Sequence, residues 1–162
     1  MDLKSGAWQK VSQLSEPLPA GVALAVDFNP VADRMRILGS NGLSLRVNVE
    51  DGKATVDGML KYAPTDAALH KSPNVTAAAY TNSMAGAKET TLYDLDTALG
   101  TLLRQAPPND GILTTVGALG ITLEGPSAFD VRSDGMGTHV GWLLNGGRLH
   151  TVDLATGAAG AG

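Results

Sequence analysis

The sequence predicts an all-β fold built from repeated units of about four strands each. One observation is a five-residue turn motif that recurs along the chain. Another is a series of short apolar runs that end at Asn-Gly, Asp-Gly or proline, which are turn signals. The composition agrees, because 162 residues with 20 glycines, 43% hydrophobic and only 17% charged residues suit short strands joined by tight turns.

The turn motif consists of Asp or Asn, an apolar residue, two mostly polar residues, and Gly or Ala. An Asp or Asn side chain can accept a backbone hydrogen bond from two residues further on, and Gly supplies a positive φ, so the motif predicts a hairpin turn. Its recurrence at intervals of roughly 50 residues predicts an array of similar β modules. The copies lie at residues 2–6, 48–52 and 153–157, with a degenerate copy at 94–98.

The first unit is expected over residues 22–60. A mostly buried strand ends at Pro30, which cannot continue a strand in the middle of a sheet. A second strand leads into Asn41-Gly42, a strong hairpin signal, and the third strand alternates apolar and polar residues. The strands of this unit are predicted at 22–30, 34–38, 43–49 and 54–56.

Two further units follow a proline-rich stretch at 57–74, which is predicted to be a loop with one helical turn near 65–70. The second unit covers 75–121 and the third covers 127–157. The third unit contains its own Asn145-Gly146 hairpin signal. The strands predicted are 75–82, 90–96, 100–105 and 113–119 in the second unit, and 128–133, 138–144 and 148–154 in the third.

Four-stranded units of this length are typical of β-propeller blades. The third unit lacks a fourth strand, whereas an additional strand predicted at 8–14 belongs to no unit. Because an unpaired edge must be covered, we expect this N-terminal strand to complete the last blade, in the same chain or in a neighbour. We favour exchange between two chains, which makes a six-bladed propeller as a homodimer, with residues 1–162 forming a single all-β repeat domain.

Charge and hydropathy exclude several classes of protein. The net charge is −4 and the basic residues are scattered, which argues against a nucleic-acid surface. No apolar run is long enough to span a membrane, and no signal peptide is visible. The absence of cysteine excludes disulfides and thiolate metal sites.

Catalytic and metal motifs are also missing. There is no G-x-S-x-G elbow, and the three histidines are far apart in sequence, with His150 expected on an outward face. Acidic pairs at Asp94/Asp96 and Asp130/Asp134 lack the full calcium-loop pattern, so turn capping explains them better. We expect no catalytic residue, no metal site and no cofactor.

A candidate ligand site lies at the inner strands of the predicted propeller, where the first strand of each blade lines the axis. Three nearby arginines, Arg34, Arg36 and Arg46, would add positive charge. Such a funnel could hold a small polar or carbohydrate ligand, or a carboxylate. In the alternative interpretation the same groups hydrogen-bond one blade to the next. The candidate residues are Asp27, Asn29, Tyr80, Asn82, Asp130 and Arg132.

Three segments are DFNPVADRMRI (27–37), NVTAAAYTNS (74–83) and TTLYDLDTALGTLLRQAPPNDGIL (90–113). Together with several others, they resemble an uncharacterised bacterial family, a domain of unknown function with propeller-like repeats. The resemblance covers roughly residues 20–157 and implies an exported or surface-associated protein, without an established activity. The family usually carries one more repeat ahead of the first segment, of which only the last strand is present here.

These observations favour a non-catalytic binding or assembly module. The alternative is a carbohydrate-active hydrolase or lyase that uses a carboxylate pair from Asp27, Asp33 or Asp130 at the ring axis. A fragment of a larger protein, without a separate function, is a further possibility. Carboxylates within reach of one another would favour the enzyme, and separated ones would argue against it.

Overall fold

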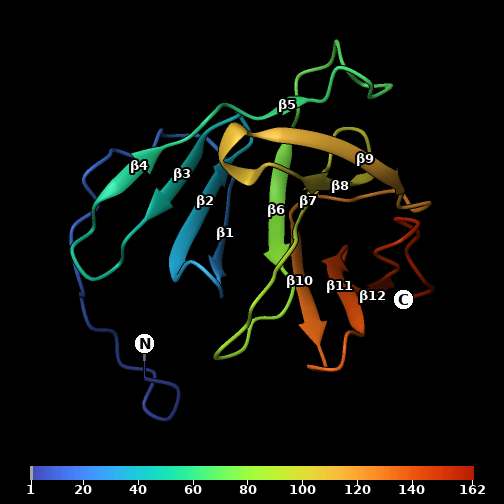
Figure 1. Ribbon diagram of the computed structural model, residues 1–162. Helices are drawn as coiled ribbons and strands as arrows, with labels where there is room; N and C mark the ends of the chain where they lie inside the picture. Colours follow the sequence, from blue (N-terminus) through green and yellow to red (C-terminus); the bar gives the residue numbers. More distant parts are fainter. Residues whose placement is uncertain (1) are drawn as a thin grey trace.

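The computed structural model describes residues 2–162 and confirms that the protein is all-β (Figure 1). The described residues contain twelve strands and one short 3-10 helix, η1 (Pro108–Asp110). The strands form three sheets, and no sheet in the described part of the chain closes into a barrel. Each sheet corresponds to one of the predicted units.

The first sheet is an antiparallel meander in the order β1-β2-β3-β4, as the sequence predicts. Its cross-strand register places Val26, Ile37, Leu45 and Val56 in one row, so these apolar side chains share one face. The opposite face carries a polar row that includes Asp27. The strands are β1 (Leu24–Asn29), β2 (Arg34–Gly39), β3 (Ser44–Val47) and β4 (Ala54–Val56).

The second sheet contains the four predicted strands and one that the sequence did not predict. This additional strand, β5 (Lys61–Tyr62), pairs in parallel with β9 and lies in the segment expected to be a loop. Two residues are too few to show the alternation that identifies a strand. The other four strands are β6 (Val75–Tyr80), β7 (Leu92–Asp96), β8 (Thr101–Gln105) and β9 (Ile112–Ala118).

The third sheet has three strands, β10 (Ser127–Ser133), β11 (His139–Asn145) and β12 (Arg148–Val152). After the turn at 153–157 the chain runs back beside β12. Ala159 forms an isolated antiparallel bridge with Val152, and the Gly160 N–H donates to the Thr151 carbonyl at 2.8 Å. Part of the open edge of β12 is therefore covered by residues of the same chain.

Residues 8–14 form no strand in this chain, in contrast to the prediction. The segment lies against the first sheet, where the Ser12 hydroxyl donates to the Val49 carbonyl at 2.7 Å, and Leu14 packs on that sheet. Figure 1 shows it near β4, at the opposite side of the molecule from β12. Apolar and polar residues alternate only loosely in this segment, and Trp8 is 83% exposed, so the Trp8 side chain does not pack on a sheet face. Pairing with another chain stays a prediction.

The recurring turn is confirmed as a local structure. Asp2 and Asp153 each accept two backbone N–H bonds through Oδ1, from the second and third residues after them. Asp96 does the same, so the second-sheet copy occupies 96–100 and the predicted 94–98 is wrong by two residues. The shift arises because the Asp94 side chain is buried inside the protein. The fifth residue has positive φ in all four copies: Gly6, Gly52, Gly100 and Gly157.

The three sheets lie side by side with their first strands innermost, because β1 contacts β6 and β6 contacts β10 (Figure 1). One apolar core fills the junction between the first and second sheets and includes Leu38 and Leu92. A second core fills the junction with the third sheet and includes Leu95 and Leu143. A smaller cluster around Leu45 lies on the other face of the first sheet. A binding site could therefore form at the inner strands or at either of the two junctions between sheets.

Candidate functional site

Among the six predicted site residues, Asp27 and Tyr80 are brought together. The Tyr80 N–H donates to Asp27 Oδ2 at 2.6 Å, so a side chain of β1 binds the backbone of β6. Asp27 Oδ1 accepts the N–H of Phe28 at 2.7 Å. Burial raises the pKa of Asp27, and repulsion from Asp130 adds to that rise, although the two N–H bonds oppose it.

The other four residues, which the structure also describes, make no side-chain hydrogen bond to Asp27 or Tyr80. Asn29 caps its own turn by accepting the N–H groups of Val31 and Ala32, both at 2.9 Å. Asn82 has a left-handed backbone with φ of 57°, and its N–H donates to the hydroxyl of Ser133 on β10 at 2.7 Å.

The two candidates on β10 are exposed. Asp130 Oδ1 accepts the N–H of Val131 at 2.8 Å, and Arg132 makes no side-chain hydrogen bond within residues 2–162. The Asp27 and Asn82 bonds join neighbouring sheets, as the alternative interpretation expects. Ligand binding by these six residues stays a prediction.

A stronger constellation is an arginine–carboxylate cluster at the junction of the first and second sheets. Asp57, which follows β4, accepts Arg36 Nη1 at 2.6 Å and Arg46 Nε at 2.7 Å through Oδ2. Its Oδ1 accepts Arg46 Nη2 at 2.9 Å. The two arginines are cross-strand neighbours on β2 and β3, which places both guanidinium groups on one face. The hydrogen bonds that Arg46 donates to Asp57 raise the pKa of Arg46.

Arg36 is the centre of this cluster and is only 2% exposed. Its Nε donates to the Tyr80 hydroxyl at 3.3 Å, and its Nη1 donates to Ser44 Oγ at 3.1 Å. Its Nη2 donates to Asn109 Oδ1 at 2.8 Å, which links β2 to the 3-10 helix. One side chain on β2 therefore contacts β3, β6, the segment after β4 and the 3-10 helix.

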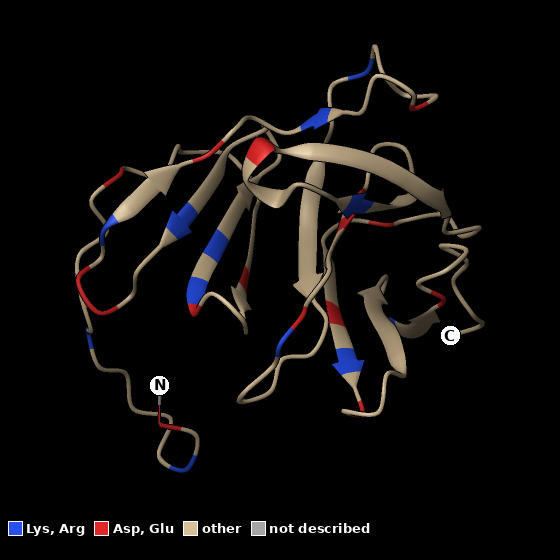
Figure 2. Ribbon diagram, viewed as in Figure 1, with Lys and Arg blue, Asp and Glu red and all other residues tan. Residues whose placement is uncertain are grey.

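A cavity of about 220 Å³, which we call the arginine pocket, opens beside this cluster. Arg34 also lines it and donates from Nη1 only to the Asp33 carbonyl, at 2.7 Å. Lys and Arg segments lie side by side on β2 and β3 in Figure 2. Asp57 is the one carboxylate ion-paired with these guanidinium groups in the described part of the chain, so the pocket is positively charged. Its lining residues are Asn29, Ala32, Arg34, Arg36, Arg46, Tyr80, Pro108 and Asn109.

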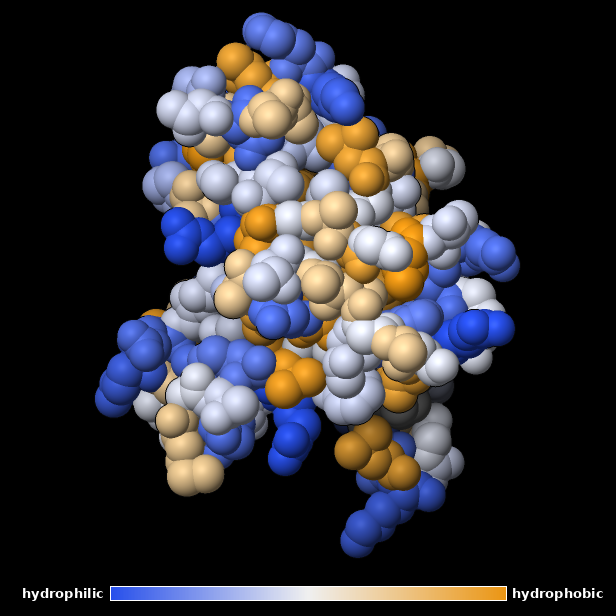
Figure 3. Space-filling view, turned by 90° about the vertical axis from the view of Figure 1, so that its right-hand side faces the viewer, coloured by the Kyte–Doolittle hydropathy of each residue, from blue (hydrophilic) through white to orange (hydrophobic). Residues whose placement is uncertain are grey.

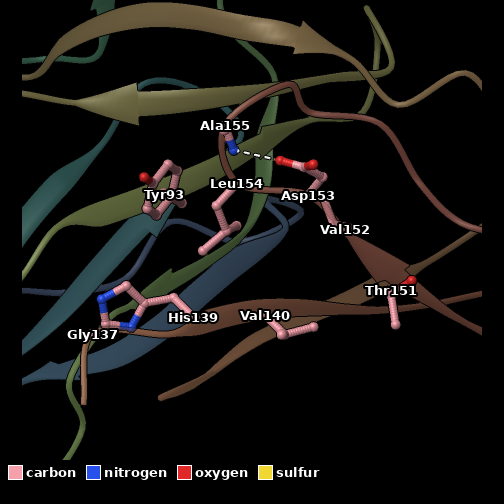
Figure 4. Close-up of a pocket in the computed structure, with 9 residues that line it drawn as sticks. All are labelled: Tyr93, Gly137, His139, Val140, Thr151, Val152, Asp153, Leu154 and Ala155. Carbon is pink, nitrogen blue, oxygen red and sulfur yellow. Dashed lines mark hydrogen bonds between the residues drawn. The ribbon is translucent and has the colours of Figure 1, made fainter. Parts of the chain in front are cut away.

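A larger and more open groove of about 630 Å³ lies between the second and third sheets (Figure 4). His139 and Tyr93 line it, and His139 Nδ1 shares a hydrogen bond with Ser133 Oγ at 2.8 Å. Asp153 also lines the groove, where its Oδ1 accepts the Ala155 N–H at 2.7 Å, and no hydrogen bond within residues 2–162 joins it to that histidine. This groove therefore contains no Ser-His-Asp triad among its described residues.

His150 was expected on an outward face, and that prediction is wrong. Its side chain is buried, and Nδ1 donates to the Gly160 carbonyl at 2.9 Å. The reason is that residues 158–160 fold back along β12, an arrangement that the sequence pattern does not reveal.

Two buried carboxylates, Asp94 and Asp96, lie two positions apart on β7. Asp96 accepts the Tyr62 hydroxyl at 2.6 Å, while the oxygens of Asp94 have no hydrogen-bond partner within residues 2–162. Burial raises the pKa of Asp94 to about 8, although the charge of Arg36 opposes the rise. The described residues contain no group of three or more His, Cys, Asp or Glu side chains placed to hold a metal ion.

The sheets and the cluster define an all-β domain with a buried arginine–carboxylate network at a sheet junction. Residues 1–161 match a family model described as "Domain of unknown function (DUF4394)", and the chain belongs to this family. The resemblance inferred from the sequence is confirmed at the level of the family. No curated protein and no solved structure matches the chain. None of residues 2–162 lies in a helix long and apolar enough to cross a membrane.

Proposed function

We propose that this domain is a non-catalytic binding module, a group of propeller-type blades, whose arginine pocket takes a small ligand with a carboxylate group. An acidic sugar such as a uronate combines the carboxylate and carbohydrate character expected of the ligand. The observation that carries the proposal is the convergence of Arg34, Arg36 and Arg46 on one cavity, with Asp57 as the ion-pair partner of Arg36 and Arg46 alone.

The geometry of the pocket favours an oxyanion over a neutral ligand. A guanidinium group presents its donors in a planar fork that matches a carboxylate, and such charge-assisted bonds are about twice as strong as neutral ones. Arg36 is held in place by four side-chain hydrogen bonds before any ligand arrives. Arg34 is exposed, and its donors reach the same cavity. The volume of about 220 Å³ suits a ligand the size of one sugar ring or smaller.

The hydrolase or lyase alternative receives less support. Asp27 uses both carboxylate oxygens to accept backbone N–H groups, which fits a structural role better than a catalytic one. Asp33 belongs to the exposed β1–β2 turn and has a left-handed backbone with φ of 50°. A catalytic carboxylate pair needs two groups that face the same substrate.

Calorimetric titration with glucuronate, and with glucose as the neutral comparison, tests the proposal. We expect glucuronate to bind and Arg34→Gln to weaken binding by about 10- to 100-fold, which corresponds to the loss of one charge-assisted contact. Arg34 is exposed, so the substitution should leave the fold intact. Arg132→Gln is the matched control on β10. Equal binding of glucose and glucuronate, or a larger effect of Arg132→Gln, would contradict the arginine pocket.

A further inference from the structure

The series of packed sheets ends in two faces that no sheet of this chain covers. The outer face of the third sheet carries Trp142 and Leu144, with Leu144 47% exposed. The outer face of the first sheet carries Val26 and Phe28, with Phe28 45% exposed. Figure 3 views the molecule from the third-sheet side and shows apolar atoms at the surface among polar ones. Exposed apolar sheet faces mark interaction surfaces.

The outer face of the third sheet corresponds to the face of the first sheet that is buried against the second sheet. In the first sheet Ala25 pairs with Leu38, and this pair is buried against the second sheet. In the third sheet Ala128 pairs with Leu144 in the same relation, but this pair is exposed. The register thus gives the third sheet the same apolar contact surface, without an occupant.

The outer face of the first sheet corresponds to the face of the second sheet that packs against the first sheet. In the second sheet Tyr80 pairs with Leu92, and both pack in the core with Leu38. In the first sheet Phe28 pairs with Met35 at the equivalent place. Leu14 and the segment around it cover only part of this face, so that Val26 and Phe28 remain exposed.

The two unoccupied faces both carry an aromatic residue at the position where the internal junction has a polar pair. Within the chain, Arg36 donates to the Tyr80 hydroxyl. Because Asp27 pairs with Arg36 and Asp130 pairs with Trp142, the position equivalent to Arg36 in the third sheet is Trp142. The position equivalent to Tyr80 in the first sheet is Phe28, which has no hydroxyl. A polar pair at the internal junction is thus replaced by two aromatic residues, which pack favourably together.

We propose that a second copy of this chain occupies both faces. The third sheet of each protomer packs on the first sheet of the other, with Leu144 beside the partner face that contains Val26 and Phe28. Because each chain carries one face of each kind, two copies related by a twofold axis satisfy all four faces and close a ring of six sheets. The contact uses sheet faces, so it does not require residues 8–14 to pair with β12.

The mass of the protein in solution is the first test. Light scattering after size exclusion at about 10 μM should give twice the chain mass of 16.6 kDa. Leu144→Asp and Phe28→Asp should each give monomers with an unchanged circular dichroism spectrum. Leu69→Asp, at a position 39% exposed in the loop before β6, should leave the dimer intact. A monomeric wild type, or a dimer that both face variants retain, would overturn the proposal.

Cysteine cross-linking tests which faces meet, and the chain is well suited because it has no cysteine. An equimolar mixture of Val26→Cys and Leu144→Cys variants should form a covalent dimer under mild oxidation. Neither variant alone should do so, and a mixture of Val26→Cys and Leu69→Cys should also stay unlinked. Efficient linking of Val26→Cys to itself would show a face-to-self contact. In the double variant Val26→Cys/Leu144→Cys, a closed ring stays a covalent dimer, whereas covalent species larger than two chains would show an open array. Either result would overturn the closed ring.

Discussion

Replacing Arg36 by Met should destabilise the protein more than any other single change in the arginine cluster. Met keeps much of the volume of the side chain but removes all four of its hydrogen bonds. Asp57 would stay paired with Arg46, so no isolated carboxylate is left behind. The buried hydroxyls of Ser44 and Tyr80 would lose a partner, at about 1–3 kcal/mol for each unsatisfied group.

The expected loss in the free energy of unfolding is about 3 kcal/mol, near the lower end of the range for breaking a buried ion pair. For a chain of this length that loss corresponds to a fall in Tm of about 6–12 °C. Urea unfolding followed by circular dichroism measures it. Arg46→Met is the matched control and should cost less than about 1 kcal/mol, because this side chain is partly exposed. A loss below 1 kcal/mol for Arg36→Met, or equal losses for both variants, would refute the central role of Arg36.

Two further predictions concern a buried acid and a close backbone approach. The pKa of Asp94 is raised from 3.8 to about 8, so between these values the folded protein keeps a proton that the unfolded chain releases, and stability falls as the pH rises from about 4 to 8. Asp94→Asn should remove this fall in stability. In urea unfolding, the variant should gain stability relative to the wild type as the pH rises toward 8. A difference in the free energy of unfolding that is the same at all pH values would contradict the prediction. Gly52→Ala should cost well over 1 kcal/mol, because a Cβ there would collide with the Gln13 backbone and φ is 74°. Gly6→Ala has a similar φ of 69° but open space, so thermal melting should show a smaller loss there.

Local patterns in the sequence were sufficient to locate the main strands. Asn41-Gly42 and Asn145-Gly146 mark hairpins, and the strand from Ala54 to Val56 has the predicted bounds. These signals act between residues a few positions apart, which is the range that periodicity reports. The same range explains the failures. Two-residue β5 is too short to alternate, and residues 8–14 contact the first sheet without forming a strand.

The candidate site was less accessible to sequence reasoning because its contacts span long distances along the chain. The sequence shows that Arg36 and Arg46 are close together along the chain. Nothing local identifies Asp57 as the partner of both arginines, or Asn109 as a partner of Arg36. Asn109 lies 73 positions after Arg36. Asn29 accepts two N–H groups of its own turn and also lines the arginine pocket, and neither role is evident from its position in the sequence. Only the packing of two sheets decides which polar groups meet.

The five-residue turn has a kinetic consequence. Its Asp or Asn binds N–H groups two or three positions away, so we expect each copy to form before any sheet meets another. Closing such short loops is fast, on the order of microseconds for a hairpin. Docking of the sheets, which needs Arg36 to find Tyr80 and Asn109, involves distant residues and comes later. Substitutions of Asp96 or Asp153 should therefore slow refolding, whereas Arg36→Met should chiefly accelerate unfolding.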